Sequence, residues 1–382
     1  MKYYIIAGEA SGDLHGSKLV KHLRLGDPEA ELRAWGGELM EKAGAEVVKH
    51  YRDLAFMGFA EVIANLNTIR RNFDFCKKDM LSFAPDVVIL IDYPGFNLRM
   101  ARFAHEHGLR VFYYISPQIW AWKQSRVNLV KAYVDEMYVI LPFERDFYAR
   151  FGVDVHYVGH PLIDALEEHR AEAADLSAFR KMHELDKRPI IALLPGSRKQ
   201  EIGRMLPVMI DAASRQGGHQ IAIAAAPSQD LDFYKDFCSG SDVRIVENDT
   251  YALLHYSVAA LVTSGTATLE AALLRVPQVV CYKGSALSYA IARLLVKVPY
   301  ISLVNLIMDR PLVEEVIQGD LKAESLARSL DQLIHQPEKR QELLQGYGEL
   351  YRKLGGVGAS EKTARHMLKT LRESSVHESP LS

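Results

Sequence analysis

Acidic side chains stand at the ends of two apolar stretches in the first half of the chain. The stretch "IIAGEASGDLHG" (5–16) carries Glu9 and Asp13 in a glycine-punctuated turn, and "VVILIDYPGFN" (87–97) places Asp92 before a Pro-Gly pair. A carboxylate at the end of an apolar strand is partly removed from water, which raises its pKa toward the value that a general base needs. Asp92 is therefore a candidate base, although the same residue would also serve as a cap for the helix after Asn97.

Phosphate-binding turns expose main-chain N–H groups to a polyanion, which the two acids of the first turn would repel. The better phosphate candidate is "IIALLPGSRKQEIGR" (190–204), where Gly196 and Ser197 end an apolar run, Arg198 follows and helical periodicity begins near Lys199. Gly196 permits close approach of the main chain, a helix N-terminus supplies donors, and the planar guanidinium matches phosphate oxygens. The alternative is an ordinary turn whose arginine forms a surface ion pair.

A second turn of this kind is "VTSGTATLEAALL" (262–274). Its small residues Ser264, Gly265 and Thr266 precede a helix and suit a diphosphate, and the carboxylate of Glu270 can accept both hydroxyls of a ribose. The alternative is a common helix start with a glutamate in its first turn. Acids in the first half and phosphate binders in the second half together suggest group transfer from a nucleotide donor to a hydroxyl acceptor.

Several other chemistries are excluded by the sequence. It holds no G-x-x-x-x-G-K-[ST] loop, no G-x-G-x-x-G after the first strand and no G-x-S-x-G elbow. Metal sites are not predicted either, because "HEH" at 105–107 suits a helix C-terminus and "DLD" at 230–232 suits a solvated helix face.

The elements that must position these residues are short apolar runs separated by amphipathic helical stretches. Continuous Val, Ile, Leu and Ala runs are typical of parallel strands covered on both faces, and their alternation with helices predicts βαβ repeats in both halves. Ligands of such sheets bind at the carboxyl ends of the strands, so function is expected in the turns that follow them. The predicted strands are 3–7, 32–35, 87–92, 110–115, 136–141 and 155–158, then 190–194, 220–225, 244–247, 259–262, 278–282 and 300–303.

A chain of 382 residues is too long for one ordinary core, and we expect two domains of similar size. A charged, strand-free stretch separates the two sets of strands, and a glycine-rich break at "LGGVGAS" precedes the last helix. These signals predict a first domain over 1–163, a second over 164–354, and a C-terminal helix with a polar tail over 355–382.

The composition, with 48% hydrophobic and 25% charged residues, is that of a globular protein, and the net charge of −2 argues against a dedicated nucleic-acid binder. Three widely separated cysteines predict neither a disulfide framework nor a zinc knuckle. No signal peptide is recognisable, and no apolar run reaches the ~18 residues that span a bilayer. We expect a cytosolic protein that can still sit on a membrane surface.

Six motifs stand out along the chain: "GEASGD" (8–13), "IDYPGFN" (91–97), "SPQIWAWK" (116–123), "LLPGSR" (193–198), "SGTATLE" (264–270) and "SLVNLI" (302–307). In their order they resemble the motifs of lipid-A-disaccharide synthases, and the resemblance covers residues 3 to 370. It implies a GT-B-like α/β fold of two doubly wound, Rossmann-like domains that face a cleft. It implies an inverting enzyme that joins UDP-2,3-diacylglucosamine to 2,3-diacylglucosamine 1-phosphate (lipid X), forming the β-1,6-linked lipid A disaccharide precursor and UDP.

The same resemblance implies site residues and surroundings. Asp92 is similar to the family's candidate base, Arg198 to its phosphate-side arginine, and Glu270 and Asn305 to donor-site residues. The diphosphate turn would be Ser264, Gly265 and Thr266, with Gly196 and Ser197 in the neighbouring turn. The family acts at the cytoplasmic face of the bacterial inner membrane, without a metal or organic cofactor, and a homodimer is compatible with this assignment.

The turn after the first strand is implied on the acceptor side, where its acids face sugar hydroxyls and the reacting centre while the phosphates go to the second domain. Its residues are Gly8, Glu9, Ser11, Gly12 and Asp13. Many members carry D-x-P-D-F-N in the next motif, and Gly95 stands here in place of the second acid. Asp92 is thus left as the only candidate base in that loop.

Two other interpretations stay open. One is another UDP-sugar enzyme of GT-B fold, such as a UDP-N-acetylglucosamine 2-epimerase, and the other is a nonenzymatic UDP-sugar-binding protein, which would need no acid at Asp92.

The stretch 57–78 has an apolar stripe at helical spacing beside a basic cluster of Arg70, Arg71, Lys77 and Lys78. An interfacial helix on anionic lipid needs this combination, whereas such a stripe more often faces the protein's own core. The hypothesis is that part of the stripe is exposed and docks on the bilayer. The stripe consists of Phe59, Val62, Ile63, Leu66, Ile69 and Phe73.

Overall fold

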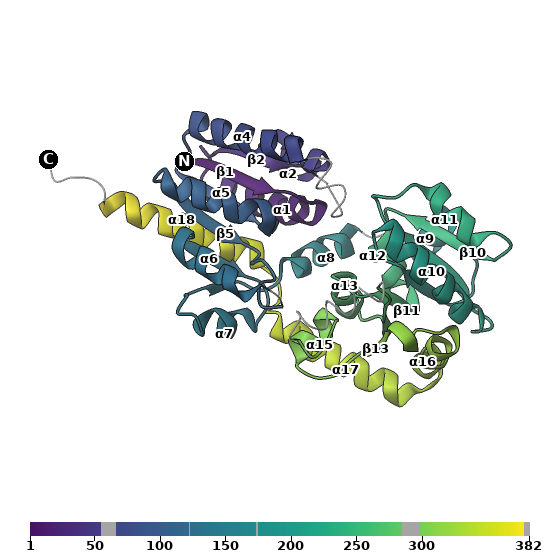
Figure 1. Ribbon diagram of the computed structural model, residues 1–382. Helices are drawn as coiled ribbons and strands as arrows, with labels where there is room; N and C mark the ends of the chain where they lie inside the picture. Colours follow the sequence, from purple (N-terminus) through teal and green to yellow (C-terminus); the bar gives the residue numbers. More distant parts are fainter. Residues whose placement is uncertain (55–65, 122, 173–174, 285–297, 378–382) are drawn as a thin grey trace. The chain divides into compact units, whose positions relative to one another are not determined.

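The computed structural model describes residues 1–54, 66–121, 123–172, 175–284 and 298–377, and the chain divides into two compact units (Figure 1). The first unit is Met1–Ala165 together with Leu354–Ser382, and the second is Leu166–Lys353. The segment predicted as a separate C-terminal part, 355–382, thus groups with the first unit, and the predicted division after residue 163 lies next to the observed one.

The first unit is built on a seven-stranded parallel sheet in the order β3-β2-β1-β4-β5-β6-β7. All five residues of the central strand β4, VVILI, are buried, as the continuous apolar run predicts for a strand covered on both faces. The strands are β1 (Lys2–Ala7), β2 (Glu31–Gly36), β3 (Glu46–His50), β4 (Val87–Ile91), β5 (Arg110–Tyr114), β6 (Glu136–Val139) and β7 (His156–Tyr157). The helices include α1 (Ala10–Gly26), α2 (Glu38–Lys42), α4 (Leu66–Phe83), α5 (Pro94–Glu106), α6 (Val127–Tyr133), α7 (Glu144–Ala149) and α18 (Ala359–His377).

The second unit holds a six-stranded parallel sheet in the order β10-β9-β8-β11-β12-β13. Helix α8 (Pro161–Glu172) runs across the division between the units. The strands are β8 (Ile190–Leu194), β9 (Gln220–Ala225), β10 (Val243–Glu247), β11 (Ser257–Thr263), β12 (Gln278–Tyr282) and β13 (Glu314–Ile317). The helices include α9 (Leu176–Met182), α10 (Lys199–Ser214), α11 (Leu231–Cys238), α12 (Thr250–His255), α13 (Ala267–Leu273), α15 (Leu303–Met308), α16 (Ala323–His335) and α17 (Pro337–Lys353).

The strand order of each sheet reverses at one point, between β1 and β4 in the first unit and between β8 and β11 in the second. A reversal leaves a crevice at the carboxyl ends of the two strands, which is where doubly wound sheets bind their ligands. The four turns singled out in the sequence follow these four strands. The topology therefore brings the predicted acceptor turns together in one unit and the predicted phosphate turns together in the other.

The predicted strands differ from the structure in three places: two edge strands were not predicted, and one predicted strand is wrong. The strands β3 and β13 escaped prediction because their sequences, EVVKH and EEVI, carry charged residues and lack the continuous apolar run of the central strands. The predicted strand 300–303 does not form, because Ser302 caps α15 with its hydroxyl by accepting a hydrogen bond from the N–H of Asn305.

The last helix, α18, is bonded at both ends to the first unit. The carboxylate of Asp164 accepts hydrogen bonds from the N–H groups of Gly358 and Ser360, at 2.6 and 3.1 Å, at its amino end. Near its other end, the guanidinium of Arg372 donates to the carbonyl oxygen of Gly26, the last residue of α1, at 2.6 Å. Among the described residues, none of the helices combines the length and apolar composition that crossing a bilayer requires.

Candidate functional site

The turns after β1 and β4 contact each other at the strand-order reversal of the first unit. A Cβ atom built on Gly8 would lie 2.3 Å from Cδ1 of Tyr93, so only glycine lets the two turns approach this closely. A Cβ atom on Gly12 would lie 3.1 Å from Cβ of Ala7, which shows how tightly α1 leaves the end of β1. Ser11 is exposed in the first turn of α1. The glycines predicted to bind substrate thus shape this site through packing.

The main chain at Asp92 has the left-handed conformation, with φ of 45° there and 49° at Tyr93. The carbonyl oxygen of Asp92 accepts hydrogen bonds from the hydroxyl of Tyr113 at 2.6 Å and from Nδ2 of Asn97 at 2.8 Å. Such backbone conformations are uncommon outside glycine and gather at functional sites, where surrounding structure enforces them. Tyr93 occupies the cap position of α5, so Asp92 lies outside the helix and the capping alternative lacks support.

Burial raises the pKa of Asp92 to about 7, and the negative charge of Glu9 adds to this rise. Asp92 is half-buried, whereas Glu9 is exposed at the cap position of α1. A carboxyl group with this pKa can take a proton from a hydroxyl group near neutral pH more readily than an ordinary aspartate can. Gly95 is exposed, and a Cβ atom there would meet no described atom within 4 Å, so the loop has room for the second acid that it lacks.

Asp13, in contrast, is a structural residue. Its side chain is buried, and its carboxylate accepts three main-chain hydrogen bonds, from Gly37 at 2.8 Å, Leu39 at 3.1 Å and Met40 at 3.0 Å. These N–H groups belong to the start of α2, which would otherwise leave them unpaired. The geometry therefore gives no support to Asp13 as a catalytic acid or base, since its oxygens are occupied in fixing α2 against α1.

In the second unit, Gly196 turns the chain after β8 with φ of +101°, a conformation that favours glycine. Arg198 occupies the cap position of α10, and its side chain is 66% exposed, with one long 3.5 Å contact to Glu201. Its guanidinium is thus available to a ligand at the helix N-terminus. The carbonyl oxygen of Ser197 accepts a 2.8 Å hydrogen bond from Nε2 of Gln229, which ties this turn to the loop after β9.

The neighbouring turn after β11 carries Gly265 and Thr266 exposed to solvent, while the hydroxyl of Ser264 donates to the carbonyl oxygen of Ile301 at 2.7 Å. The two turns are neighbours, since a Cβ atom on Gly196 would lie 3.5 Å from Cγ2 of Thr263. The predicted phosphate turns therefore do lie together at the carboxyl edge of the second sheet.

Glu270 is half-buried on α13, and burial raises its pKa to about 7. Its charge also helps to raise the pKa of Tyr251, which places the two side chains near each other. A carboxyl group that is partly withdrawn from water, and that forms no ion pair with the described residues, is suited to bind hydroxyl groups of a ligand.

Asn305 is occupied in the same way as Asp13. It is buried, its Nδ2 donates to the carbonyl oxygen of Val313 and to Oε1 of Glu315, both at 2.9 Å, and its Oδ1 accepts from the N–H of Val313 at 2.9 Å. Glu315 in turn accepts from the N–H groups of Ile301 and Ser302. The geometry therefore supports an effect of Asn305 on the shape of this loop and gives no support to a direct contact with the donor.

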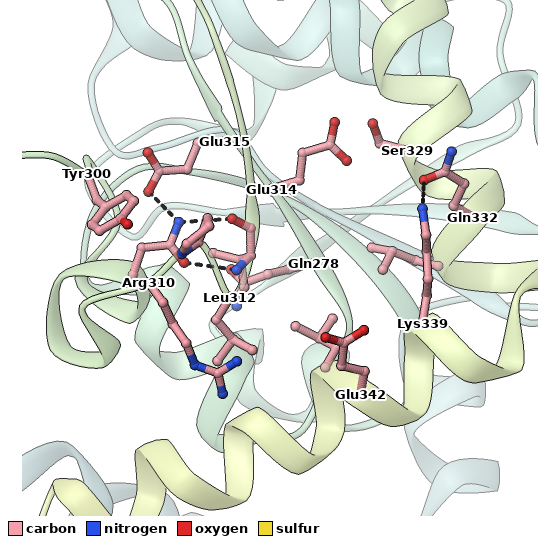
Figure 2. A pocket seen from close by; sticks show the side chains of 15 residues that line it. Gln278, Tyr300, Arg310, Leu312, Glu314, Glu315, Ser329, Gln332, Lys339 and Glu342 are labelled. Atoms are coloured by element: carbon pink, nitrogen blue, oxygen red, sulfur yellow. Dashed lines mark hydrogen bonds between the residues drawn. The ribbon is translucent and has the colours of Figure 1, made fainter.

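A pocket of about 530 Å³ lies beside Asn305, but not where the sheet topology places the ligand. It is lined by Gln278 and Glu314, the first residues of β12 and β13, and so opens at the amino edge of the sheet. Figure 2 shows charges of both signs around it, with Lys339 donating to Gln332 and Arg310 on the opposite side. Of the predicted site residues, only Asn305 lines this pocket.

Two groups of titratable side chains in the first unit were not predicted from the sequence. Glu144 is buried, accepts hydrogen bonds from the N–H groups of Ile140 and Leu141, and has its pKa raised by burial to about 7; Ser116 and Trp120 of the "SPQIWAWK" motif lie beside it. The motif "SPQIWAWK" was the available signal, because a conspicuous polar and aromatic motif next to a strand calls for a buried partner such as Glu144.

The second group is a pair of histidines. Burial lowers the pKa of His15 on α1 to about 4 and that of His160 to about 3, and His15 adds to the shift of His160. Both imidazoles are therefore neutral at pH 7. No spacing pattern links them in the sequence, so only the fold could reveal the pair.

The proposed docking stripe falls partly outside the described residues, which exclude Phe59, Val62 and Ile63. Within α4, Phe73 is half-buried and stacks on Phe96 of α5 with ring centroids 4.4 Å apart. This part of the stripe packs on the protein, while Arg70 and Arg71 are exposed.

The chain matches the family model described as lipid-A-disaccharide synthetase over residues 3–368. It is 41% identical to the lipid-A-disaccharide synthase of Syntrophus aciditrophicus over 377 residues, which cover 97% of this chain and 98% of that protein. It is 36% identical to the lipid-A-disaccharide synthase of Coxiella burnetii (strain CbuK_Q154) over 365 residues, which cover 94% of this chain and 96% of that protein.

Two solved structures share the fold of this chain over nearly its whole length. A UDP-GlcNAc 2-epimerase from Neisseria meningitidis bound to UDP-GlcNAc is similar with a TM-score of 0.67 and 13% identity, covering 98% of this chain and all of that one. The glycotransferase of kitacinnamycin is similar with a TM-score of 0.64 and 12% identity, and the likeness covers 97% of this chain and 99% of that chain. At such identities the likeness concerns the fold alone, and it confirms the predicted architecture of two doubly wound parallel-sheet domains.

Proposed function

Because the chain belongs to the lipid-A-disaccharide synthase family, we propose that the turns of its two units divide one glycosyl transfer between them. The enzyme is a glycosyltransferase that joins UDP-2,3-diacylglucosamine to 2,3-diacylglucosamine 1-phosphate and forms the β-1,6-linked disaccharide precursor of lipid A with release of UDP. The first unit takes the acceptor sugar at the turns after β1 and β4. The second unit takes the UDP group at the turns after β8 and β11.

The transfer is a single inverting displacement. The 6-hydroxyl oxygen of the acceptor attacks C1 of the donor sugar, its proton passes to the carboxylate of Asp92, and the bond from C1 to the diphosphate oxygen breaks. A positioned base typically contributes ~10²–10⁴-fold to such a step. The main-chain hydrogen bonds at the Asp92 carbonyl oxygen fix the turn from which this carboxylate acts.

Negative charge develops on the departing UDP. The guanidinium of Arg198 and the first N–H groups of α10, which Arg198 does not cap with its side chain, oppose this charge, which is how preorganised dipoles and cations lower a barrier. Glu270 supplies an acceptor for hydroxyl groups of the donor.

The observation that carries the proposal is the position of Asp92. A half-buried carboxyl group with a pKa of about 7 stands at the carboxyl end of the central strand, beside the strand-order reversal of its sheet. A nonenzymatic UDP-sugar-binding protein would have no use for it. The likeness to epimerases rests on a common fold at 13% identity and does not favour that alternative over relatives that are 36–41% identical.

The test is incubation of the purified protein with the two acylated monosaccharides, followed by mass spectrometry. We expect disaccharide and UDP in equal amounts from the wild-type chain, and neither from a folded Asp92→Asn variant beyond a residual rate. Conversion of the UDP-sugar to its 2-epimer, or UDP binding without turnover in the wild-type chain, would support the alternatives.

Both substrates carry acyl chains, so the enzyme has to meet a lipid surface. The exposed Arg70 and Arg71 on α4 are the docking cations for an anionic bilayer, at the cytoplasmic face of the bacterial inner membrane. A homodimer stays a prediction.

A further inference from the structure

Three side chains from distant parts of the sequence meet at the amino edge of the first sheet. Glu136 and His156 are the first residues of β6 and β7, and His366 lies on α18. One carboxylate oxygen and two imidazole nitrogens from these residues lie within 4.8 Å of one another. No local motif links such positions, so the sequence alone predicts no metal site here.

The cluster is already organised by direct contacts. Nε2 of His156 lies 2.6 Å from Oε2 of Glu136, and the rings of His156 and His366 lie 4.0 Å apart between centroids. Nδ1 of His366 lies 3.1 Å from the hydroxyl of Tyr138, whose side chain is buried. This contact fixes the ring and leaves Nε2 of His366 as its ligand atom, an orientation that metal-binding histidines commonly receive from an outer partner.

We propose that Glu136, His156 and His366 bind a divalent transition-metal ion, with Zn²⁺ as the best match. Two imidazoles and one carboxylate are a donor set that Zn²⁺ accepts at about 2.0–2.2 Å, whereas Mg²⁺ and Ca²⁺ prefer oxygen ligands. In a tetrahedral site such ligand atoms lie about 3.4 Å apart, so small side-chain rotations bring these three into range.

The fourth coordination position has space for water. A pocket of about 340 Å³ is lined by both His156 and His366, together with the cations Arg145 and Lys362. The two cations repel a divalent ion and so lower the affinity of the site. Both side chains are exposed, and solvent screens this repulsion.

The ion would have a structural role, not a catalytic one. Its ligands begin β6 and β7 at the amino edge of the sheet, whereas Asp92 stands at the carboxyl end of β4. β7 is an edge strand of two residues, and α18 comes from the far end of the chain. Coordination would fasten this strand and this helix to β6, so metal binding is coupled to the stability of the first unit.

The competing explanation is a metal-free cluster in which Glu136 and His156 share a proton. The experiment treats the full chain with a chelator, removes the chelator, and titrates Zn²⁺ by calorimetry and by competition with a chromophoric chelator. We expect one Zn²⁺ per chain and a higher melting temperature in its presence, because a ligand that binds only the folded state stabilises it.

The variants test the assignment residue by residue. His156→Ala and His366→Ala should each weaken Zn²⁺ binding by at least ~10²-fold, and Tyr138→Phe by roughly 10-fold, since loss of an outer partner typically weakens binding 10–100-fold. The matched control is His335→Ala, which removes an exposed histidine that lies 3.9 Å from Asp331 on α16. Its Zn²⁺ affinity should equal that of the wild type.

A measurement on the wild-type chain keeps the proposal testable if the variants do not fold. X-ray absorption of the zinc-loaded protein should show two imidazole ligands and no sulfur, and the Co²⁺ form should show visible absorption of a four-coordinate ion without a thiolate band. Absence of stoichiometric binding, sulfur ligation, or undiminished affinity in folded His366→Ala would overturn the site in favour of the metal-free cluster.

Discussion

The ring of Tyr93 fills the space next to Gly8, where a Cβ atom would lie 2.3 Å from its Cδ1 atom. This contact joins the turn after β1 to the turn after β4, so the same packing positions Glu9 and Asp92. The electrostatic effect of one acid on the other depends on this approach. The first-unit site is thus held together by a position at which no side chain is tolerated.

Replacing Asp92 by Asn should lower turnover by at least ~10²-fold, because the amide cannot accept the proton of the acceptor hydroxyl. Asn tolerates the left-handed φ of 45° at this position, so the turn should keep its shape. UDP affinity should be retained, since the proposed UDP turns belong to the other unit. Turnover is measured by UDP release, with Asp74→Asn on the exposed face of α4 as the control. Near-normal turnover would exclude Asp92 and direct attention to Glu9.

Replacing Glu9 by Gln should move the acid limb of the pH–rate profile to lower pH. Asp92 can accept a proton only when it is deprotonated, so turnover falls as the pH drops below its pKa of about 7. Burial is the larger cause of that raised pKa and stays, but the negative charge of Glu9 also raises it. Removing this charge therefore lowers the pKa, and we expect the limb to move by roughly 0.5–1 pH unit. Glu29→Gln, at an exposed loop residue, should leave the profile in place; a shift to higher pH would contradict the arrangement.

Replacing Arg198 by Ala should weaken UDP binding roughly 10- to 150-fold, which corresponds to about 1.5–3 kcal/mol for hydrogen bonds to a charged group. Isothermal titration calorimetry measures this directly. Arg204→Ala is the matched control, because Arg204 is exposed on the same helix α10. Equal UDP affinity in the folded Arg198→Ala and wild-type chains would place the diphosphate elsewhere.

Replacing Asp13 by Ala should lower the free energy of unfolding by about 2–4 kcal/mol, because three N–H groups, two of them buried, lose their acceptor. Urea unfolding monitored by circular dichroism is the measurement. Glu41→Ala, at an exposed residue of α2, should change stability by less than about 0.5 kcal/mol. A catalytic role for Asp13 would appear instead as lost turnover in a variant of undiminished stability.

Reversing two charges on α4, with Arg70→Glu and Arg71→Glu, should reduce flotation with anionic vesicles and make the remaining binding less dependent on salt. UDP affinity should not change. The double variant Lys181→Glu with Lys187→Glu alters the same number of charges at exposed residues of the second unit and serves as the control. Equal flotation of the wild type and the α4 variant would exclude this cluster as the docking site.

The site turns could be predicted because their signals are local. Glycine, acid and hydroxyl residues directly follow runs such as VVILI and IIALL, whose complete burial the apolar composition already indicates. What could not be predicted depends on partners far away in the chain. Asp13 and Asn305 look like site residues, and only the N–H groups of Gly37 and Val313 show that their side chains are occupied. The edge strands β3 and β13 escaped because sheet edges carry charged residues for reasons unrelated to strand propensity.

The return of α18 to the first unit has a consequence for biosynthesis. Residues 166–353 form a unit that is contiguous in the sequence, whereas the first unit is completed by residues that are translated last. Until Leu368 arrives, the surface of α1 near Gly26, on which this leucine packs, stays uncovered, and Asp164 lacks its two amide donors. While the second unit is being translated, the first unit therefore lacks its last helix. Incompletely packed chains of this kind expose apolar surface and are the ones that chaperones bind.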